Sequence, residues 1–177
     1  MVHTSKLLPA SLSVALLAAA TLVGGQAQAA TILRNNLIQA VASCQGNLPN
    51  SEGSLRKRPL AVANEGTTSA FVTCGFQDIN NNPSGTQSVT VYFINNSAAD
   101  VTVNCTLVNG ILNAALFDIT YLPKSIVVTA GNVNAVGWSA GADNEGTNFV
   151  APSLSCALPG KTDLSLINHV FPEEIGG

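Results

Sequence analysis

Charged side chains are scarce in this chain. Only 10% of its 177 residues are charged, seven basic against ten acidic, whereas about a quarter is usual for a globular domain. A general nucleic-acid-binding protein needs a basic face to neutralise phosphates, and this composition disfavours such a protein. Asparagine, threonine, serine and glutamine supply the polarity instead, as is common on the solvent faces of extracellular β-proteins.

Long apolar runs are missing beyond the first residues. The stretch 7–23 is shorter than a membrane span of about 20 residues and contains Pro9. Lys6 precedes it and the small-x-small triplet 27–29 follows it, a pattern typical of an export signal. We therefore expect cleavage directly after this triplet, one mature domain over residues 30–177, no membrane span, and an extracellular or periplasmic location.

Helical periodicity is also nearly absent. From Phe71 onward, apolar residues mostly recur at every second position, which is the pattern of half-buried β-strands. Turns rich in asparagine, glycine and proline separate these runs, and no helical segment lies between them. The sequence therefore predicts an all-β fold, an antiparallel β-sandwich of jelly-roll or Ig-like (immunoglobulin-like) type. The alternating runs are Val72–Phe76, Val89–Phe93, Val101–Leu107, Phe117–Tyr121, Ile126–Val128, Val136–Trp138, Leu154–Leu158 and Leu164–Phe171.

One stretch has a different spacing. Leu33, Leu37 and Val41 recur at every fourth residue ahead of Cys44. Apolar residues spaced in this way lie on one face of a helix. The spacing predicts a short helix near the start of the mature chain.

The four cysteines include no C-x-x-C pair and have no histidine cluster beside them, which disfavours a zinc or redox site. In an exported chain they are expected to form disulfides. Cys74, Cys105 and Cys156 each lie in an alternating run, so they should point into the core. Four cysteines allow three pairings, of which we favour Cys44–Cys74 and Cys105–Cys156, because pairing of neighbours suits a meander of strands.

The pentapeptide Gly137–Gly141 matches G-x-S-x-G, the nucleophile elbow of α/β-hydrolases. In that interpretation Ser139 attacks an ester, His169 accepts its proton, and Asp143 or Asp163 orients the imidazole. The motif requires a strand, a turn and a helix within a parallel sheet, yet the pattern here is antiparallel. The sequence favours a glycine-rich turn after a strand and keeps a serine esterase as an alternative.

Two polar segments resemble cation-binding loops. Asp78–Asn82 has the alternating oxygen side chains of a calcium loop, but Pro83 occupies the position where an EF-hand needs glycine, and no glutamate closes the site. Asp143–Glu145 is a weaker candidate of the same kind. We expect neither a metal nor any other cofactor.

Half of the basic residues of the mature chain lie in one segment, Arg56, Lys57 and Arg58, directly before Pro59. One interpretation is a local anion patch for a polysaccharide, a lipid headgroup or a cell-wall polymer. The other is a charged sheet edge that prevents strand-to-strand aggregation, which the proline would reinforce. Three charges make only a small patch, so the charged edge is favoured.

Several segments together resemble small exported four-cysteine β-proteins of Gram-negative and related bacteria, to which no activity is assigned. The resemblance implies export, strands and disulfides, and it carries no catalytic or binding residues. Fimbrial subunits share the export, the sandwich and a disulfide, and they stay an alternative. The segments that carry the resemblance are Cys44–Gln45, Leu55–Leu60, Asn64–Thr67, Phe71–Cys74, Val103–Thr106 and Leu154–Pro159.

These observations predict a secreted or periplasmic, non-enzymatic β-sandwich that acts as a structural or ligand-binding module. Its partner is expected to be an extracellular surface, a polymer or a protein. A serine esterase that uses Ser139 is one alternative, and an exported inhibitor or protein-interaction module is another.

Overall fold

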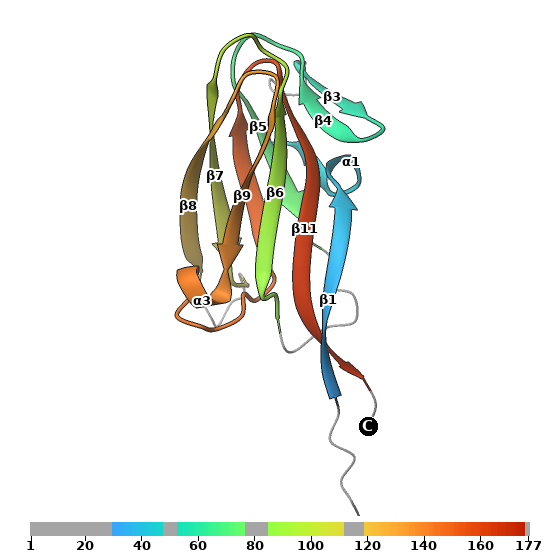
Figure 1. Ribbon diagram of the computed structural model, residues 1–177, viewed down its shortest axis with the longest axis vertical. Coiled ribbons are helices and arrows are strands. Elements are labelled where there is room, and N and C mark those ends of the chain that lie inside the picture. Colours follow the sequence, from blue (N-terminus) through green and yellow to red (C-terminus); the bar gives the residue numbers. More distant parts are fainter. Residues whose placement is uncertain (1–29, 48–52, 77–84, 112–118, 176–177) are drawn as a thin grey trace, which may run out of the picture.

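Two antiparallel β-sheets pack face to face in the structure (Figure 1). It is a computed structural model, and it describes residues 30–47, 53–76, 85–111 and 119–175. The predicted calcium loop at Asp78–Asn82 therefore lies outside the described residues.

Sheet A contains six strands and sheet B contains five. Sheet A comprises β1 (Ala30–Gln39), β3 (Leu55–Arg58), β4 (Ala61–Asn64), β6 (Ser88–Asn95), β9 (Val133–Ser139) and β11 (Thr162–Ile175). Sheet B comprises β2 (Cys44–Gly46), β5 (Ala70–Gly75), β7 (Val101–Asn109), β8 (Thr120–Val128) and β10 (Ser153–Leu158). Two single helical turns, α1 (Ala40–Ser43) and α3 (Ala140–Asp143), complete the described elements.

The strand order identifies the sandwich as a jelly roll. Sheet A contains the strand order β4-β11-β6-β9, and sheet B contains the order β5-β10-β7-β8. Between β4 and β11 the chain changes sheet at every connection except the β7–β8 hairpin, which is the double Greek-key path of a jelly roll. The predicted antiparallel β-sandwich is confirmed, and of the two alternatives the jelly roll is the one observed.

Alternation of apolar and polar residues generates the core. In β6 the burial pattern is strictly alternating, and the inward side chains Val89, Val91 and Phe93 are fully buried. Successive residues of a strand point to opposite faces, so each apolar set packs between the sheets while the residues between them face outward. Trp138 and Phe149 are the other large aromatic side chains of this core.

Both disulfides connect neighbouring strands of sheet B. Cys44 in β2 lies opposite Cys74 in β5, and the two are bonded with Cα atoms 4.0 Å apart. Cys105 in β7 lies opposite Cys156 in β10, and the bonded pair has Cα atoms 4.1 Å apart. All four side chains are buried in the core. The predicted pairing and the inward orientation are both confirmed.

The predicted helix over Leu33, Leu37 and Val41 is wrong. Residues Ala30–Gln39 form strand β1, which pairs antiparallel with β11 at ten consecutive positions. A spacing of four residues puts side chains on one face of a strand as well as on one face of a helix, and the ten-residue ladder with β11 decides for the strand. In this stretch only α1 is helical, and this single turn carries the chain from sheet A to sheet B.

Two further features differ in detail from the alternating runs. The end of the run 117–121 and the run 126–128 belong to one continuous strand, β8, while residues 117–118 lie outside the described residues. Strands β3 and β4 form a hairpin that the alternation did not predict. All four residues of β4 are buried, so this strand has no alternation of apolar and polar residues.

Strands β1 and β11 extend past the rest of sheet A. Pairing of β11 with β6 ends at Val170, whereas its pairing with β1 continues to Ile175. Figure 1 shows this part as a two-stranded ribbon that projects from the sandwich. The far edge of β1 has no paired strand among the residues that the structure describes.

Candidate functional site

The three residues of the predicted esterase site do not come together. His169 lies opposite Val89 in the sheet, so its side chain faces the core, whereas Asp163 lies opposite Ile94 on the outer face. His169 lies six positions after Asp163 in β11, which corresponds to roughly 20 Å along the strand. Ser139 is the last residue of β9, and β9 lies on the other side of β6 from β11. The chain therefore does not assemble a Ser-His-Asp triad from these residues.

Ser139 acts as the N-cap of α3. Its hydroxyl accepts a hydrogen bond from the backbone N–H of Ala142 (3.3 Å), and its own backbone N–H donates to the Asp143 carboxylate (2.9 Å). These reciprocal bonds satisfy donors that a helix start otherwise leaves unpaired, as in a capping box. The local geometry of the G-x-S-x-G segment is thus explained by capping of a helical turn.

Lys124 closes the open side of the sandwich between β8 and β9. Its ammonium group donates to the Gly137 carbonyl (2.7 Å) and pairs with the Asp143 carboxylate (2.8 Å), and it lies 5.8 Å from the Trp138 ring centroid. The Trp138 indole N–H also crosses between the sheets and donates to the carbonyl of Leu122 (2.8 Å). These contacts hold β8 against β9 and fix the position of α3.

The pKa of Asp143 lies below its ordinary value of 3.8. Burial raises it, but hydrogen bonds from Lys124 and from the Ser139 backbone N–H, together with the Lys124 charge, outweigh burial. This carboxylate is therefore engaged in holding the helical turn and the lysine. The weak cation site predicted at Asp143–Glu145 loses its first ligand for the same reason.

His169 is a core residue. Its Nε2 lies 2.6 Å from the Thr86 hydroxyl, and its ring stacks on Phe76 with centroids 5.8 Å apart and lies 5.2 Å from the Phe171 centroid. The side chain is fully buried. Burial in the core and the hydrogen bond to Thr86 leave it no access to an ester substrate.

The basic segment forms β3, an outer strand of sheet A. Arg58 and Arg56 both make ion pairs with Glu65. Lys57 lies opposite the inward-facing Val62, so its side chain is on the other face of the strand. The three cations do not converge on one surface, and an anion patch here stays a prediction.

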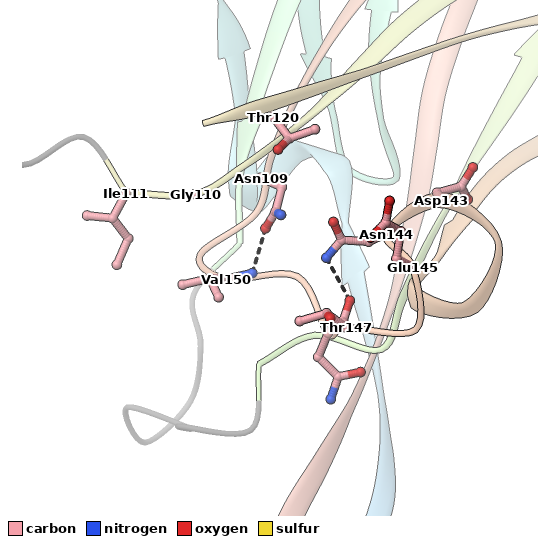
Figure 2. A pocket seen from close by; sticks show the side chains of 10 residues that line it. Asn109, Gly110, Ile111, Thr120, Asp143, Asn144, Glu145, Thr147 and Val150 are labelled. Atoms are coloured by element: carbon pink, nitrogen blue, oxygen red, sulfur yellow. Dashed lines mark hydrogen bonds between the residues drawn. The ribbon is translucent and has the colours of Figure 1, made fainter. Parts of the chain in front are cut away.

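A pocket of about 580 Å³ opens at the end of the sandwich beside α3. Figure 2 shows Asn109 and Thr120 on the side of β7 and β8, and Asn144, Glu145 and Thr147 on the loop after α3. The lining combines asparagine amides and threonine hydroxyls with the carboxylates of Asp143 and Glu145 and the apolar side chains of Ile111 and Val150.

Two of these asparagines shape the loops around the pocket. Asn109 accepts a hydrogen bond from the Val150 backbone N–H (2.6 Å), and Asn144 donates to the Thr147 carbonyl (2.7 Å), as Figure 2 shows. Glu145 has a φ of 50°, a conformation that costs energy in a residue other than glycine. The pocket wall is therefore a defined loop structure held by side-chain hydrogen bonds.

Among the residues that the structure describes, the strands of sheet B place no charged side chain on its outer face. Its strands alternate, so the residues between the buried positions form rows across the sheet. Ser125 donates to Asn104 (2.6 Å) within one such row. The outward residues are Gln45, Phe71, Thr73, Gly75, Thr102, Asn104, Thr106, Val108, Tyr121, Pro123, Ser125, Val127, Ser153, Ser155 and Ala157.

Two aromatic rings are exposed on this face. Phe71 is 46% exposed and Tyr121 is 65% exposed. Phe71 in β5 and Ser125 in β8 belong to the same row, and their strands are three positions apart in the sheet. Along β8, Tyr121 lies four residues from Ser125. Strand spacings of about 4.8 Å and a rise of about 3.4 Å per residue put the two Cα atoms roughly 20 Å apart. Tyr121 directly follows Thr120, which lines the pocket, so this end of the face lies next to the pocket although the two side chains point to opposite sides of β8.

This face was not recognised in the sequence. In the sequence Tyr121 ends the alternating run Phe117–Tyr121 and Phe71 directly precedes the run Val72–Phe76, and neither position by itself indicates a binding face. The signal in the sequence is the set of polar residues that alternate with the apolar ones, because these residues face outward when the apolar ones face the core.

Within the described residues, no group of three or more histidine, cysteine, aspartate or glutamate side chains could hold a metal ion. No helix in this part of the chain is long and apolar enough to cross a membrane.

No family model matches the sequence, and no curated protein matches it. Among solved structures, the chain is similar to an exo-β-1,3-galactanase from Phanerochaete chrysosporium, with 15% identity, a TM-score of 0.45 and 77% of this chain covered. It spans only 29% of that enzyme's length.

Two smaller proteins are similar over most of their length. The family 11 carbohydrate-binding module from Clostridium thermocellum has 8% identity and a TM-score of 0.36, with 83% of this chain and 84% of the module covered. The coat protein of Tobacco streak virus has 9% identity and a TM-score of 0.37, with 81% and 89% covered. The likeness is a loose one between β-sandwiches, and no ligand of this chain follows from it.

Proposed function

We propose that this chain is a non-enzymatic binding module that holds a neutral extracellular polysaccharide against the outer face of sheet B. The observation that carries the proposal is an uncharged five-stranded face with two exposed aromatic rings, Phe71 and Tyr121.

The chemistry of the face matches an uncharged, hydroxyl-rich polymer. The apolar C–H faces of sugar rings pack on aromatic rings, which offer large rigid contact areas at low entropic cost. The intervening threonine, serine, asparagine and glutamine side chains both donate and accept hydrogen bonds, as sugar hydroxyls require. Binding of nucleic acid or of an anionic polymer is disfavoured, since this face offers no cation to neutralise a phosphate or carboxylate.

The shape of the face favours a chain over a small molecule. Two rings roughly 20 Å apart on a sheet surface are too distant for one monosaccharide, so an extended ligand is needed to contact both. The neighbouring pocket, whose amide, hydroxyl and carboxylate groups can hydrogen-bond to sugar hydroxyls, would receive one end or a branch of such a chain.

We further propose that the module acts outside the cytoplasm after export. The predicted signal at residues 1–29 and the two buried disulfides support an oxidising compartment. Mass spectrometry of exported material should give a mature chain that begins at Ala30 and contains no free thiol.

The test is binding of the full chain, recovered after export, to a panel of insoluble polysaccharides. We expect retention on at least one neutral polymer, with little change between low and high salt, because no counterions are released. Phe71→Ala and Tyr121→Ala should each weaken retention by about tenfold or more.

Val133→Ala is the matched control, because Val133 is also an exposed apolar residue (58%) but lies on sheet A. This variant should bind as the wild type does. Absence of retention on every neutral polymer, or unchanged retention of a Phe71→Ala/Tyr121→Ala double variant, would refute the proposal.

A further inference from the structure

The outer strands of both sheets, other than β1, are protected against pairing with another chain. Strand β3 consists of Leu55 followed by three cations and then Pro59, β8 contains Pro123 and Lys124, and β2 has three residues. Strand β9 is tied to β8 by the Lys124 and Trp138 contacts. Charge, proline, shortness and coverage are the usual devices that keep an edge strand from adding a further strand.

Strand β1 has none of these devices. It is ten residues long, contains no proline or lysine, and pairs with β11 without a register shift. Its one charge, Arg34, is paired with Glu173 of β11. Leu33 and Leu37 are 57% and 63% exposed on its outward face. A long, regular edge of this kind is a template for another strand.

The residue pattern of β1 is the same when read in either direction from Asn35. Leu33 and Leu37 lie two positions to each side, Ile32 and Ile38 lie three positions to each side, and the polar residues Thr31 and Gln39 lie four positions to each side. Arg34 and Asn36, both polar, flank the centre. An antiparallel pair of identical strands needs this symmetry, because each residue then lies opposite its counterpart in the reversed copy.

We infer that two copies of this chain pair antiparallel through β1, with the two-fold axis at Asn35, and so form a continuous sheet A across a dimer. Leu33 of one protomer lies opposite Leu37 of its partner on the outer face, and Ile32 lies opposite Ile38 on the inner face. The two copies of Arg34 face Asn36 rather than each other, so like charges are not opposed.

The palindromic pattern of β1 indicates that the strand that pairs with its free edge is β1 of a second copy of this chain. A strand of unrelated sequence needs no palindromic partner, whereas an isologous interface requires the same patch to be complementary to itself. The pairing covers the exposed leucines and supplies main-chain hydrogen-bond partners along the free edge. It leaves the outer face of sheet B uncovered, and it does not depend on the proposed polysaccharide binding.

Cysteine cross-linking of the full exported chain tests the register. Directly opposed residues of antiparallel strands are close enough for a disulfide, as the two native pairs of this protein illustrate. Asn35→Cys should therefore give a covalent dimer through Cys-to-Cys linkage at the two-fold axis. Thr31→Cys is the control on the same face of the same strand, because the two copies would be eight residues apart, roughly 27 Å.

The equilibrium is measured by sedimentation over a range of concentrations. The wild-type chain should form a dimer, and Leu37→Lys should raise the dissociation constant at least about tenfold by opposing a charge to Leu33 of the partner. Val133→Lys changes an equally exposed residue of sheet A away from β1 and should leave the dimer intact. A chain that stays monomeric at all concentrations, equal effects of the two lysine variants, or cross-linking of Thr31→Cys as efficient as that of Asn35→Cys would overturn the inference.

Discussion

Ser139, Asp143 and Lys124 form one small network at the junction of β9 and α3. The serine caps the helical turn, the aspartate accepts from the serine backbone, and the lysine joins both sheets to the aspartate. At the scale of single residues, the energetic role of this network can be separated from a catalytic one by substitutions that preserve or remove a cap.

Ser139→Ala should lower the free energy of unfolding by about 1 kcal/mol, because the N-cap acceptor is lost. Ser139→Asn should stay close to the wild type, since asparagine caps a helix as well as serine does. Urea denaturation followed by tryptophan fluorescence measures both, as Trp138 is the only tryptophan. Equal destabilisation by the two variants would contradict a capping role.

Asp143 and Asp163 should give opposite pH dependences. The pKa of Asp143 is lowered in the folded chain, so its stabilising contribution is present above 3.8 and is lost as the pH falls through the folded pKa. The pKa of Asp163 is raised, because burial and the Glu65 charge outweigh the Asn96 hydrogen bond and the Arg58 charge. Its ionisation therefore lowers stability as the pH rises through the folded pKa.

Asp143→Asn should thus cost about 1–2 kcal/mol at neutral pH, and the difference from the wild type should shrink below pH 3.8. Asp163→Asn should increase stability at neutral pH and approach the wild type in acid. Urea titrations of both variants at neutral and acidic pH provide the comparison. A shift of the same sign for both variants would contradict these assignments.

At the scale of elements, the sequence predicted strands best where one face is buried and the other is solvated. In β6 and β7 the alternation alone specifies the inward face. In β1 both faces are largely exposed, so the leucines do not report a core, and their spacing of four fits a helix and a strand equally. In β4 all four residues are buried, so no alternation remains.

The proposed binding face could be predicted only in part, for a related reason. Alternation identifies Thr73 or Asn104 as outward-facing, but which outward residues become neighbours depends on the register between strands. That register is set by contacts far apart in the sequence, such as Cys105 with Cys156. The sequence therefore predicts the composition of the face but not the positions of Phe71 and Tyr121 on it.

The two disulfides lock adjacent strands in sheet B, and their removal tests how much the sandwich depends on them. In the chain-entropy model, a bond between residues 30 or 51 positions apart stabilises the fold by about 3–4 kcal/mol. A Cys105→Ala/Cys156→Ala double variant should lose about this amount in urea denaturation while its β-sheet circular dichroism is retained. The Cys44→Ala/Cys74→Ala variant should lose slightly less, because its loop is shorter. A larger loss for the shorter loop would argue against an entropic origin.

At the scale of the whole molecule, the two proposals have a joint geometrical consequence. Antiparallel pairing through β1 keeps outer residues opposite outer residues, so the two-fold axis is perpendicular to sheet A. Both copies of sheet B then lie on the same side of the continuous sheet, and their outer faces point in one direction. A dimer is therefore able to place both faces on one polymer surface.

Binding to an insoluble polymer should accordingly exceed binding to a short soluble oligosaccharide, because the second contact forms at a high effective concentration. Leu37→Lys, which separates the protomers, should weaken retention on the insoluble polymer by about tenfold or more. The same variant should leave the affinity for the oligosaccharide unchanged, as each face stays intact. Tyr121→Ala should weaken both, because it alters the face itself. Retention assays on the polymer and calorimetry with the oligosaccharide distinguish these cases. If Leu37→Lys dissociates the dimer without any loss on the insoluble polymer, the two faces do not act together.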